Sequence, residues 1–316
     1  MTTLEPTTSF LFDPTRLKVP RKPGLSGFMR IRNGEDWVKE SVLSHLDYMD
    51  EVVAVYNECT DRTPVILAEL QAAYPDKIRV VHYQPEVYPV GSDLHIQTPP
   101  NSVHSIANYY NYALSLTRYS IATKLDDDHI AIRPQWEAMR KKLEAVAFRL
   151  DQEVWCFSGI NLVSASNKLH AHAGVSFAGN GDHWLFEVTP QRIFTKDNRF
   201  ERFNRRGLKM KFMGIAYWHL KYLKKDHGFS NYALDQNPNS RYHKQKARFE
   251  AGKQGITLEE LAEHCRDRLS NANPLKRWYA SLSPKRRLAQ QRDADFDLEF
   301  LQGDLALLER EVIFKK

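Results

Sequence analysis

Ser120-Ile-Ala-Thr-Lys-Leu-Asp-Asp-Asp-His129 is a strand-like apolar run that ends abruptly in three carboxylates. Consecutive carboxylates repel one another, and a hydrophobic core would not tolerate them. In an extended chain, residues i and i+2 point to the same side. Asp126 and Asp128 are therefore expected to converge, while Asp127 points away.

Two interpretations of this acidic end remain open from the motif alone. Convergent carboxylates at the end of a strand can form a binding site for Mg²⁺ or Mn²⁺, because these ions prefer oxygen ligands and commonly bind protein carboxylates and substrate phosphates together. The alternative is a solvated acidic turn that caps the next helix.

Strand-like and helix-like segments alternate around this run. The pattern predicts strands at 27–32, 51–56, 77–83 and 121–125, helices at 37–46, 64–73 and 103–114, and a long loop at 84–101. Such alternation predicts an α/β fold with an open, mainly parallel sheet flanked by helices. Ligands bind beyond the carboxyl ends of such strands, where the polar clusters 32–33, 57–61 and 126–128 fall. The sequence has neither G-x-G-x-x-G after the first strand nor a P-loop motif.

The second half of the chain is less regular. A helix is expected at 134–150, strands at 154–160 and 171–178, and a glycine-rich turn at 179–184 that leads into a short segment ending at 188. From Thr257 the chain is predicted to be helical, since Thr257 and Glu260 form a capping-box pattern and Ser283-Pro284 opens another helix. We therefore expect an extended N-terminal arm at 1–23, a catalytic domain at 24–250 and a helical C-terminal extension at 251–316.

The composition is that of an ordinary globular protein, with 316 residues, 42% hydrophobic and 27% charged. Three cysteines, odd in number and far apart, indicate a reducing compartment. The arm lacks the apolar core of a signal peptide, and no run of eighteen apolar residues occurs. The expected location is cytoplasmic.

The net charge of +6 is concentrated in one segment. Residues 192–248, called the basic block below, hold fifteen Lys or Arg against four Asp or Glu. Such a block indicates an anionic partner, namely phosphates of a small ligand, an anionic lipid surface or nucleic acid. The alternative is a solvated cationic face without a partner.

Four short motifs occur in an order that resembles the GT-A glycosyltransferases, in particular the family 2-like bacterial enzymes. They are Arg32-Asn33-Gly34-Glu35, Cys59-Thr60-Asp61-Arg62-Thr63, Tyr110-Asn111-Tyr112-Ala113 and Asp126-Asp127-Asp128. The resemblance covers residues 27–135 well and thins toward residue 220. It implies a transferase that moves a sugar from a nucleotide diphosphate sugar to a hydroxyl of a saccharide or glycolipid, as in cell-surface polysaccharide or lipopolysaccharide assembly.

The resemblance also implies which residues contact the nucleotide. These are Arg30, Arg32, Asn57, Thr60, Asp61, Asn111, Asp126 and Asp127. Two positions depart from the family pattern. Asn57 stands where many members have an aspartate for the base or ribose, and Tyr110 stands where arginine is frequent, so phosphate charge must be met elsewhere, for example by the basic block.

The resemblance further implies a cation and a base. Mn²⁺ or Mg²⁺ would be held by Asp128 with help from Asp126, and His219 would be the third protein contact to metal or diphosphate. His219 can equally be a packed histidine without a ligand. Asp182 is the expected base that deprotonates the acceptor, with His183 as the second choice; an N-cap role is the alternative for Asp182.

The acceptor side is expected to include the basic block and the C-terminal helices, with peripheral contact to the inner membrane. Two other functions compete. A nucleic-acid-binding protein would use the basic block, but no recognisable reader motif is present and no nucleic acid is expected. A non-catalytic GT-A scaffold is the other.

Overall fold

The computed structural model describes residues 7–198, 200–237, 240–251, 255–270 and 282–313. Its strands are β1 (Lys22–Ile31), β2 (Glu51–Tyr56), β3 (Ile78–His82), β4 (Tyr119–Leu125), β5 (His129–Ala131), β6 (Glu153–Ala165), β7 (Lys168–His172), β8 (Phe177–Glu187), β9 (Phe194–Lys196), β10 (Glu201–Phe203), β11 (Lys209–His219) and β12 (Gly255–Ile256). Its α-helices are α1 (Val38–His45), α2 (Thr63–Ala73), α3 (Asp93–Gln97), α4 (Ile106–Ser115), α5 (Arg133–Ala145), α6 (Arg241–Ala251), α7 (Leu258–Ser270), α9 (Pro284–Ala294) and α10 (Leu298–Leu308).

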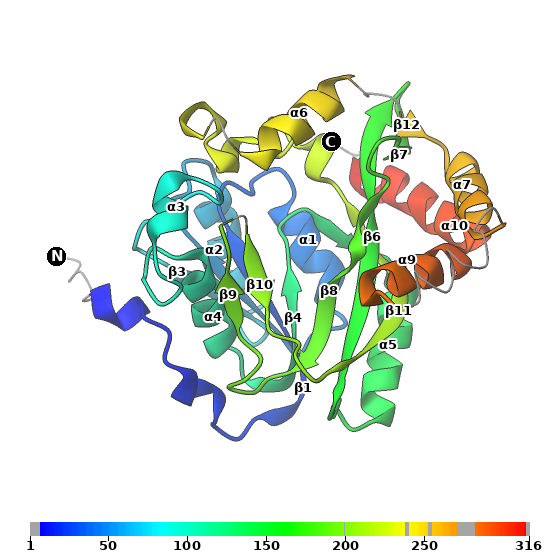
Figure 1. The fold of residues 1–316 in the computed structure, drawn as a ribbon. Coiled ribbons are helices and arrows are strands. Elements are labelled where there is room, and N and C mark those ends of the chain that lie inside the picture. The colour runs from blue at the N-terminus through cyan, green and yellow to red at the C-terminus, as the bar shows by residue number, and fades with distance from the viewer. Residues whose placement is uncertain (1–6, 199, 238–239, 252–254, 271–281, 314–316) are drawn as a thin grey trace.

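One sheet of ten described strands organises the molecule (Figure 1). Its main path is β12-β7-β6-β8-β4-β1-β2-β3, and β11 pairs with both β6 and β5. The strands β3, β2, β1 and β4 run parallel, and β8 pairs antiparallel with both β4 and β6. Helices flank this open sheet, so the predicted α/β fold class is confirmed.

Alternate residues of β1 enter different cores, as expected for a strand covered on both faces. Met29 packs with Val42 and Leu46 of the α1 side, whereas Phe28 packs with Tyr109 of α4. Met29 pairs with both Ala54 and Leu125, so β1, β2 and β4 end close to one another. This register brings the three predicted polar clusters to one edge of the sheet.

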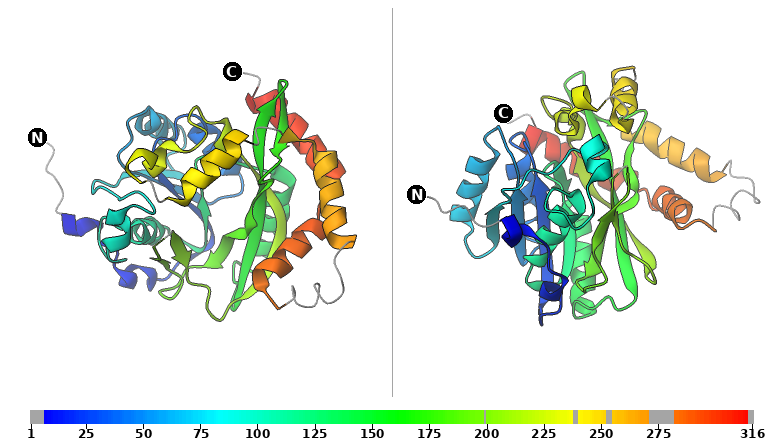
Figure 2. Two further views of the ribbon diagram at one scale, coloured as in Figure 1. Left: turned by 45° about the horizontal axis from the view of Figure 1, so that its top comes forward. Right: turned by 60° about the vertical axis from the view of Figure 1, so that its left-hand side comes forward.

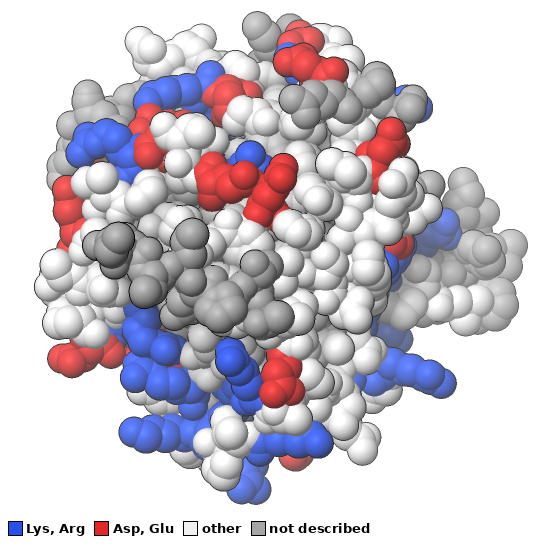
Figure 3. Space-filling view, turned by 90° about the vertical axis from the view of Figure 1, so that its left-hand side faces the viewer, with Lys and Arg blue, Asp and Glu red and all other residues white. Residues whose placement is uncertain are grey.

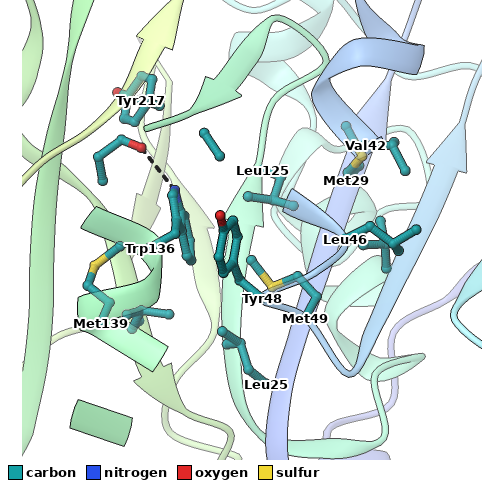
Figure 4. Packing of buried hydrophobic residues seen from close by; sticks show 14 of the residues in the cluster. Leu25, Met29, Val42, Leu46, Tyr48, Met49, Leu125, Trp136, Met139 and Tyr217 are labelled. Carbon is teal, nitrogen blue, oxygen red and sulfur yellow. Dashed lines mark hydrogen bonds between the residues drawn. The ribbon is translucent and has the colours of Figure 1, made fainter. Parts of the chain in front are cut away.

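The core beneath that edge is apolar and tightly filled (Figure 4). Trp136 of α5 is only 1% exposed, and its indole Nε1 donates to the Ala216 carbonyl at 2.9 Å. Burial of such a side chain contributes roughly 2–3 kcal/mol. Because Ala216 belongs to β11, this contact holds α5 against the strand that ends at His219.

The predicted turn at 179–184 is wrong, because these residues lie inside β8. Gly179 and Gly181 have φ angles of +78° and +76°, and the β6–β8 register shifts between Phe157 and Gly159. β8 pairs with β6 at 177–178 and 183–185 and with β4 at 185–187, so residues 179–182 bulge between these pairings, and glycine allows the left-handed bends. The strand predicted at 171–178 accordingly divides between the end of β7 and the start of β8.

Two further boundaries differ from the prediction. α5 ends at Ala145 rather than near 150, because Ala147 and Phe148 turn the chain with φ angles of +51° and +54°. The long loop at 84–101 contains the short helix α3, whose N-cap Ser92 accepts from the His95 amide at 3.1 Å.

The C-terminal helices lie beside β6 and β11 in all views (Figures 1 and 2). The capping box is confirmed, since Thr257 N donates to Glu260 Oε2 at 2.8 Å and Glu260 N to Thr257 Oγ1 at 3.2 Å. Leu261 and Leu305 share a core with Trp218 of β11. The C-terminal helices therefore complete the sheet's core, and the domain boundary at 250/251 stays a prediction. None of the described helices is long and apolar enough to cross a membrane.

Candidate active site

The polar clusters that follow β1, β2 and β4 meet at a pocket of about 290 Å³. The predicted site residues that line it are Arg30, Arg32, Asn57, Asp126, Asp127, Asp128 and His219. Their convergence follows from the parallel register, because strand ends that meet at one edge bring their following residues together.

Two neighbouring strands bring histidines to the acidic end of β4. β5 begins directly after Asp128, and its antiparallel pairing with β11 sets His129 opposite His219. The Asp128 carbonyl also accepts from the Leu220 amide at 2.8 Å. The metal ligands predicted from distant parts of the chain are therefore joined by backbone hydrogen bonds.

Asp128 and His219 form the closest carboxylate–imidazole pair among the predicted ligands. Asp128 Oδ1 lies 3.3 Å from His219 Nε2. His219 Nδ1 lies 2.6 Å from Asn161 Oδ1, which accepts a hydrogen bond, so Nδ1 carries the proton and Nε2 presents its lone pair to Asp128. Asp128 Oδ1 and His219 Nε2 are therefore close enough to bind one cation together.

His129 stands between the two carboxylates of the predicted metal site. Its ring stacks on Tyr217 with centroids 3.8 Å apart, and its Nε2 lies 3.5 Å from Asp126 Oδ2. This Nε2 is buried, and it neither accepts a hydrogen bond from a described residue nor donates one. Burial and the neighbouring His183 lower the pKa of His129 well below its ordinary value, so the ring is neutral and able to act as a ligand.

Two groups of potential ligands therefore share His129, and within each the ligand atoms lie within 4.8 Å of one another. One is Asp126, His129 and His183, and the other is Asp128, His129 and His219. Mixed carboxylate and imidazole ligands suit Mn²⁺ better than Mg²⁺, because Mg²⁺ prefers oxygen ligands alone. These residues fit a divalent ion.

The expected orientation of Asp127 is wrong, because residues 127 and 128 form a turn rather than extended strand. Lys224 Nζ lies 2.8 Å from Asp127 Oδ2 and 3.0 Å from Asp128 Oδ2. Asp126 is instead paired with Lys124, 3.3 Å away. Burial alone would raise the pKa of Asp128, but the Lys224 ammonium holds it well below its usual range.

The two predicted nucleotide-binding arginines differ in setting. The Arg30 guanidinium lies 4.6 Å from the centroid of the Tyr110 ring, and its Nη2 donates to the Tyr110 hydroxyl at 3.0 Å. That hydroxyl lies 3.1 Å from Glu201 Oε1. Arg32 is one-third exposed and 3.6 Å from Glu58, so it is the freer of the two cations.

Asn57 is 1% exposed and holds the loop after β3. Its Nδ2 donates to the Tyr83 and Pro85 carbonyls at 2.7 and 2.8 Å. Its Oδ1 accepts no hydrogen bond from a described residue. The side chain thus has one buried acceptor without a partner among the described residues.

Three predicted nucleotide contacts lie outside the pocket lining, and the geometry gives them structural contacts instead. Thr60 N donates to Asn33 Oδ1 at 2.8 Å, and Asp61 accepts from the Glu35 and Thr63 amides at 2.9 and 3.0 Å. Both amide atoms of Asn111 bind the backbone of Phe194, at 2.7 and 2.8 Å. These contacts fasten the loops around the pocket.

Of the two candidates for the base, the structure describes the side chain of His183 but not that of Asp182. The side chain of Asp182 lies outside the described part of the structure, although its backbone belongs to β8. His183 is 7% exposed, and its Nε2 lies 3.8 Å from Asp126 Oδ2. Burial lowers the pKa of His183 to about 3, so its ring is neutral. It is not part of the pocket lining.

Sequence reasoning missed His129, Lys124, Lys224 and Glu201 as residues of this region. His129 follows the carboxylates directly, and the switch from acidic to apolar residues after it was a usable signal for a new strand. Lys224 was visible only as one cation of the basic block. Glu201 lies in the hairpin β9–β10, and no local pattern connects it to Arg30.

A nucleotide-sized pocket at the carboxyl ends of parallel strands, with carboxylates and a histidine converging on it, defines a glycosyltransferase of the GT-A class. The chain belongs to the CgtA family, because the family model described as beta-1,4-N-acetylgalactosaminyltransferase (CgtA) matches residues 9–196. The match spans the strands that carry the acidic turn and ends before His219 and Lys224.

Solved structures with similar folds share little sequence with this chain. S. aureus TarS (residues 1–349) is 11% identical, with 92% of this chain and 93% of that chain covered and a TM-score of 0.39. M. tuberculosis glucosyl-3-phosphoglycerate synthase, solved with Mn²⁺, uridine diphosphate and glucosyl-3-phosphoglycerate, is 12% identical, with 71% and 83% covered and a TM-score of 0.35. No curated protein matches the sequence.

Proposed function

We propose that this glycosyltransferase moves N-acetylgalactosamine or a related hexose from a uridine diphosphate sugar to a hydroxyl of a saccharide or glycolipid, with Mn²⁺ and inversion at the anomeric centre. The sugar and the β linkage come from the name of the matching family. A β-glycoside made from an α-linked nucleotide sugar has an inverted anomeric centre. The buried Oδ1 of Asn57 lacks a partner among the described residues, so a base that reaches it would need a donor such as the ring N–H of uracil.

The observation that carries this proposal is the Asp128–His219 pair, 3.3 Å apart at the pocket wall, with the imidazole tautomer set by Asn161. A divalent ion held there would neutralise the charge that the departing diphosphate accumulates. Lys221 and Lys224, which belong to the basic block, line the same pocket and add positive charge. These two lysines supply the diphosphate with the positive charge that Tyr110 lacks, at a position where the family pattern frequently has arginine.

We keep Asp182 as the proposed base, because the alternative His183 is buried away from the pocket lining. Replacement of Asp182 by Asn should abolish transfer to the acceptor and leave slow donor hydrolysis intact, since the leaving group does not need that base. Loss of both reactions would indicate a structural role for Asp182.

The basic block does not form one face. Tyr242 at the start of α6 lines the pocket, and the same helix exposes Lys244, Lys246 and Arg248. Lys209 lies at the opposite end of β11 (Figure 1). Figure 3 shows Lys and Arg side chains across the lower part of the face that it draws. We assign contact with an anionic glycolipid surface to α6, because this helix adjoins the pocket through Tyr242 and also carries exposed basic side chains.

A thermal-shift screen tests the nucleotide and the metal together. Ligands that bind the folded state raise the melting temperature in proportion to their occupancy. Uridine diphosphate with Mn²⁺ should stabilise the wild type more than guanosine or cytidine diphosphate, and the stabilisation should disappear in Asp128→Asn. A shift of equal size in Asp128→Asn would remove the metal site from the proposal.

A further inference from the structure

Lys224 contacts carboxylates of the acidic turn, one of which belongs to the proposed metal site. It follows the 3₁₀ helix η3 (Lys221–Leu223), and the residue is only 8% exposed. Its Nζ bridges Asp127 and Asp128 at 2.8 and 3.0 Å. An ammonium group is stable at this depth only while carboxylates compensate for its lost hydration.

The two oxygens of Asp128 face different partners. Oδ1 lies toward His219 and Oδ2 toward Lys224. A dication at the Oδ1 side would therefore share one carboxylate with an ammonium group. Like charges at such a separation in a partly desolvated pocket repel strongly, so both cations cannot remain fully bound.

We propose that Lys224 is a built-in counter-cation of the acidic turn, which a divalent metal ion must displace from Asp128 in order to bind. This inference rests on the metal site in the proposed function. It assigns to Lys224 a positioning role, since the ammonium group holds Asp127 and Asp128 in place before the metal arrives and lowers the apparent affinity for it.

The backbone around Lys224 is tied down, so the side chain rather than the segment has to move. Lys225 N donates to Asp36 Oδ2 at 3.1 Å, and its Nζ lies 2.7 Å from Glu35 Oε1. Asn231 Nδ2 donates to the Arg32 carbonyl at 2.5 Å. A displaced Lys224 ammonium would stay in the pocket, where the diphosphate of the donor is expected.

Lys224→Met is the direct test, because methionine keeps much of the side-chain length and removes the charge. Titration of the full chain with Mn²⁺, followed by electron paramagnetic resonance of the free ion, should show at least about tenfold tighter binding, the size of effect that groups around a metal site exert. The control is Lys141→Met, which removes an exposed ammonium of α5 outside the pocket lining and should leave the affinity unchanged.

Lys224→Arg tests the same inference in the opposite direction. A guanidinium can hold two carboxylates through several hydrogen bonds at once, so this variant should bind Mn²⁺ more weakly than the wild type. It also keeps a cation in the core, so it tests the inference even where Lys224→Met does not fold. The inference is overturned if Lys224→Arg binds Mn²⁺ as tightly as the wild type or more tightly. It is also overturned if Lys224→Met folds and binds Mn²⁺ no more tightly than the wild type.

Asp128→Asn separates this inference from the function on which it rests. If Asp128→Asn binds Mn²⁺ as the wild type does, the metal site itself is wrong. If it loses Mn²⁺ while both Lys224 variants match the wild type, only the counter-cation role is wrong.

Discussion

The Nδ1 atom of His219 lies 2.6 Å from the side-chain oxygen of Asn161, and this contact determines which nitrogen can bind a cation. Asn161 is held in turn, because its Nδ2 donates to the Val175 carbonyl at 2.7 Å. The Val175 carbonyl, between β7 and β8, thus sets the orientation of the Asn161 amide, and that amide sets the imidazole tautomer before any ligand binds. Such outer contacts orient metal ligands and raise their basicity.

Removal of this contact should weaken metal binding. We expect Asn161→Ala to reduce Mn²⁺ affinity about 10–100-fold, because the His219 ring loses its fixed tautomer and orientation. Asn161→Asp keeps an acceptor for Nδ1–H and should retain most of the affinity. Asn204→Ala is the control, since the exposed Asn204 side chain donates to the Gln191 carbonyl and accepts from the Arg206 amide, away from the pocket lining. Equal affinity in Asn161→Ala and wild type would contradict the role given to Asn161.

The carboxylate that the wider family often has at position 57 should not be tolerated here. Asn57→Asp places a buried carboxylate against the Tyr83 and Pro85 carbonyls, which now receive hydrogen bonds from Nδ2. We expect a loss of about 3 kcal/mol or more in the free energy of unfolding, against about 2 kcal/mol for Asn57→Ala. Urea denaturation measures both. A variant Asn57→Asp as stable as the wild type would show that the loop after β3 does not depend on this amide.

The protein should lose stability in mild acid because of His45. Burial lowers the pKa of His45 from 6.5 to about 4 in the folded state, so the unfolded chain binds the proton more readily. The contribution is constant above the unfolded value and falls as the pH drops from 6.5 toward 4. Between about pH 7.5 and about pH 5 it amounts to about 2 kcal/mol.

Comparison with His45→Gln isolates this contribution. The variant cannot take up the proton, so its free energy of unfolding, measured with urea at both pH values, should fall by about 2 kcal/mol less than that of the wild type. Parallel pH profiles for the two proteins would mean that His45 titrates normally in the fold.

Charge reversal on α6 should affect glycolipid acceptors more than soluble ones. Replacement of Lys244, Lys246 and Arg248 by Glu should lower transfer to a glycolipid in anionic vesicles about a hundredfold, because each basic residue near such a surface contributes about 1 kcal/mol. Transfer to a soluble saccharide should be unchanged. The control reverses Arg206, Lys209 and Lys211, which lie in or just before β11. If both triple variants behave alike with vesicles, α6 has no special role at the membrane.

Much of the fold followed from local pattern. The β-branched run of β2 and the apolar run of β4 are recognisable because parallel strands covered on both faces exclude polar residues. The acidic turn was equally visible, since three consecutive carboxylates have no place in a core. The glycine-rich part of β8 was mistaken for a turn, because it is a bulge between two stretches that pair with β6, and this pairing is not visible in the local sequence.

The sequence alone determined which chemistry is available at the end of β4, since carboxylates after an apolar strand can only lie at its open edge. Tertiary structure determined which side chains surround these carboxylates. His129 and His219 face each other through β5–β11 pairing, Asn161 sets the imidazole tautomer from β6, and Lys224 bridges Asp127 and Asp128. These contacts join segments up to 97 residues apart. Strand register, which depends on the packing of the whole core, brings them within hydrogen-bonding distance.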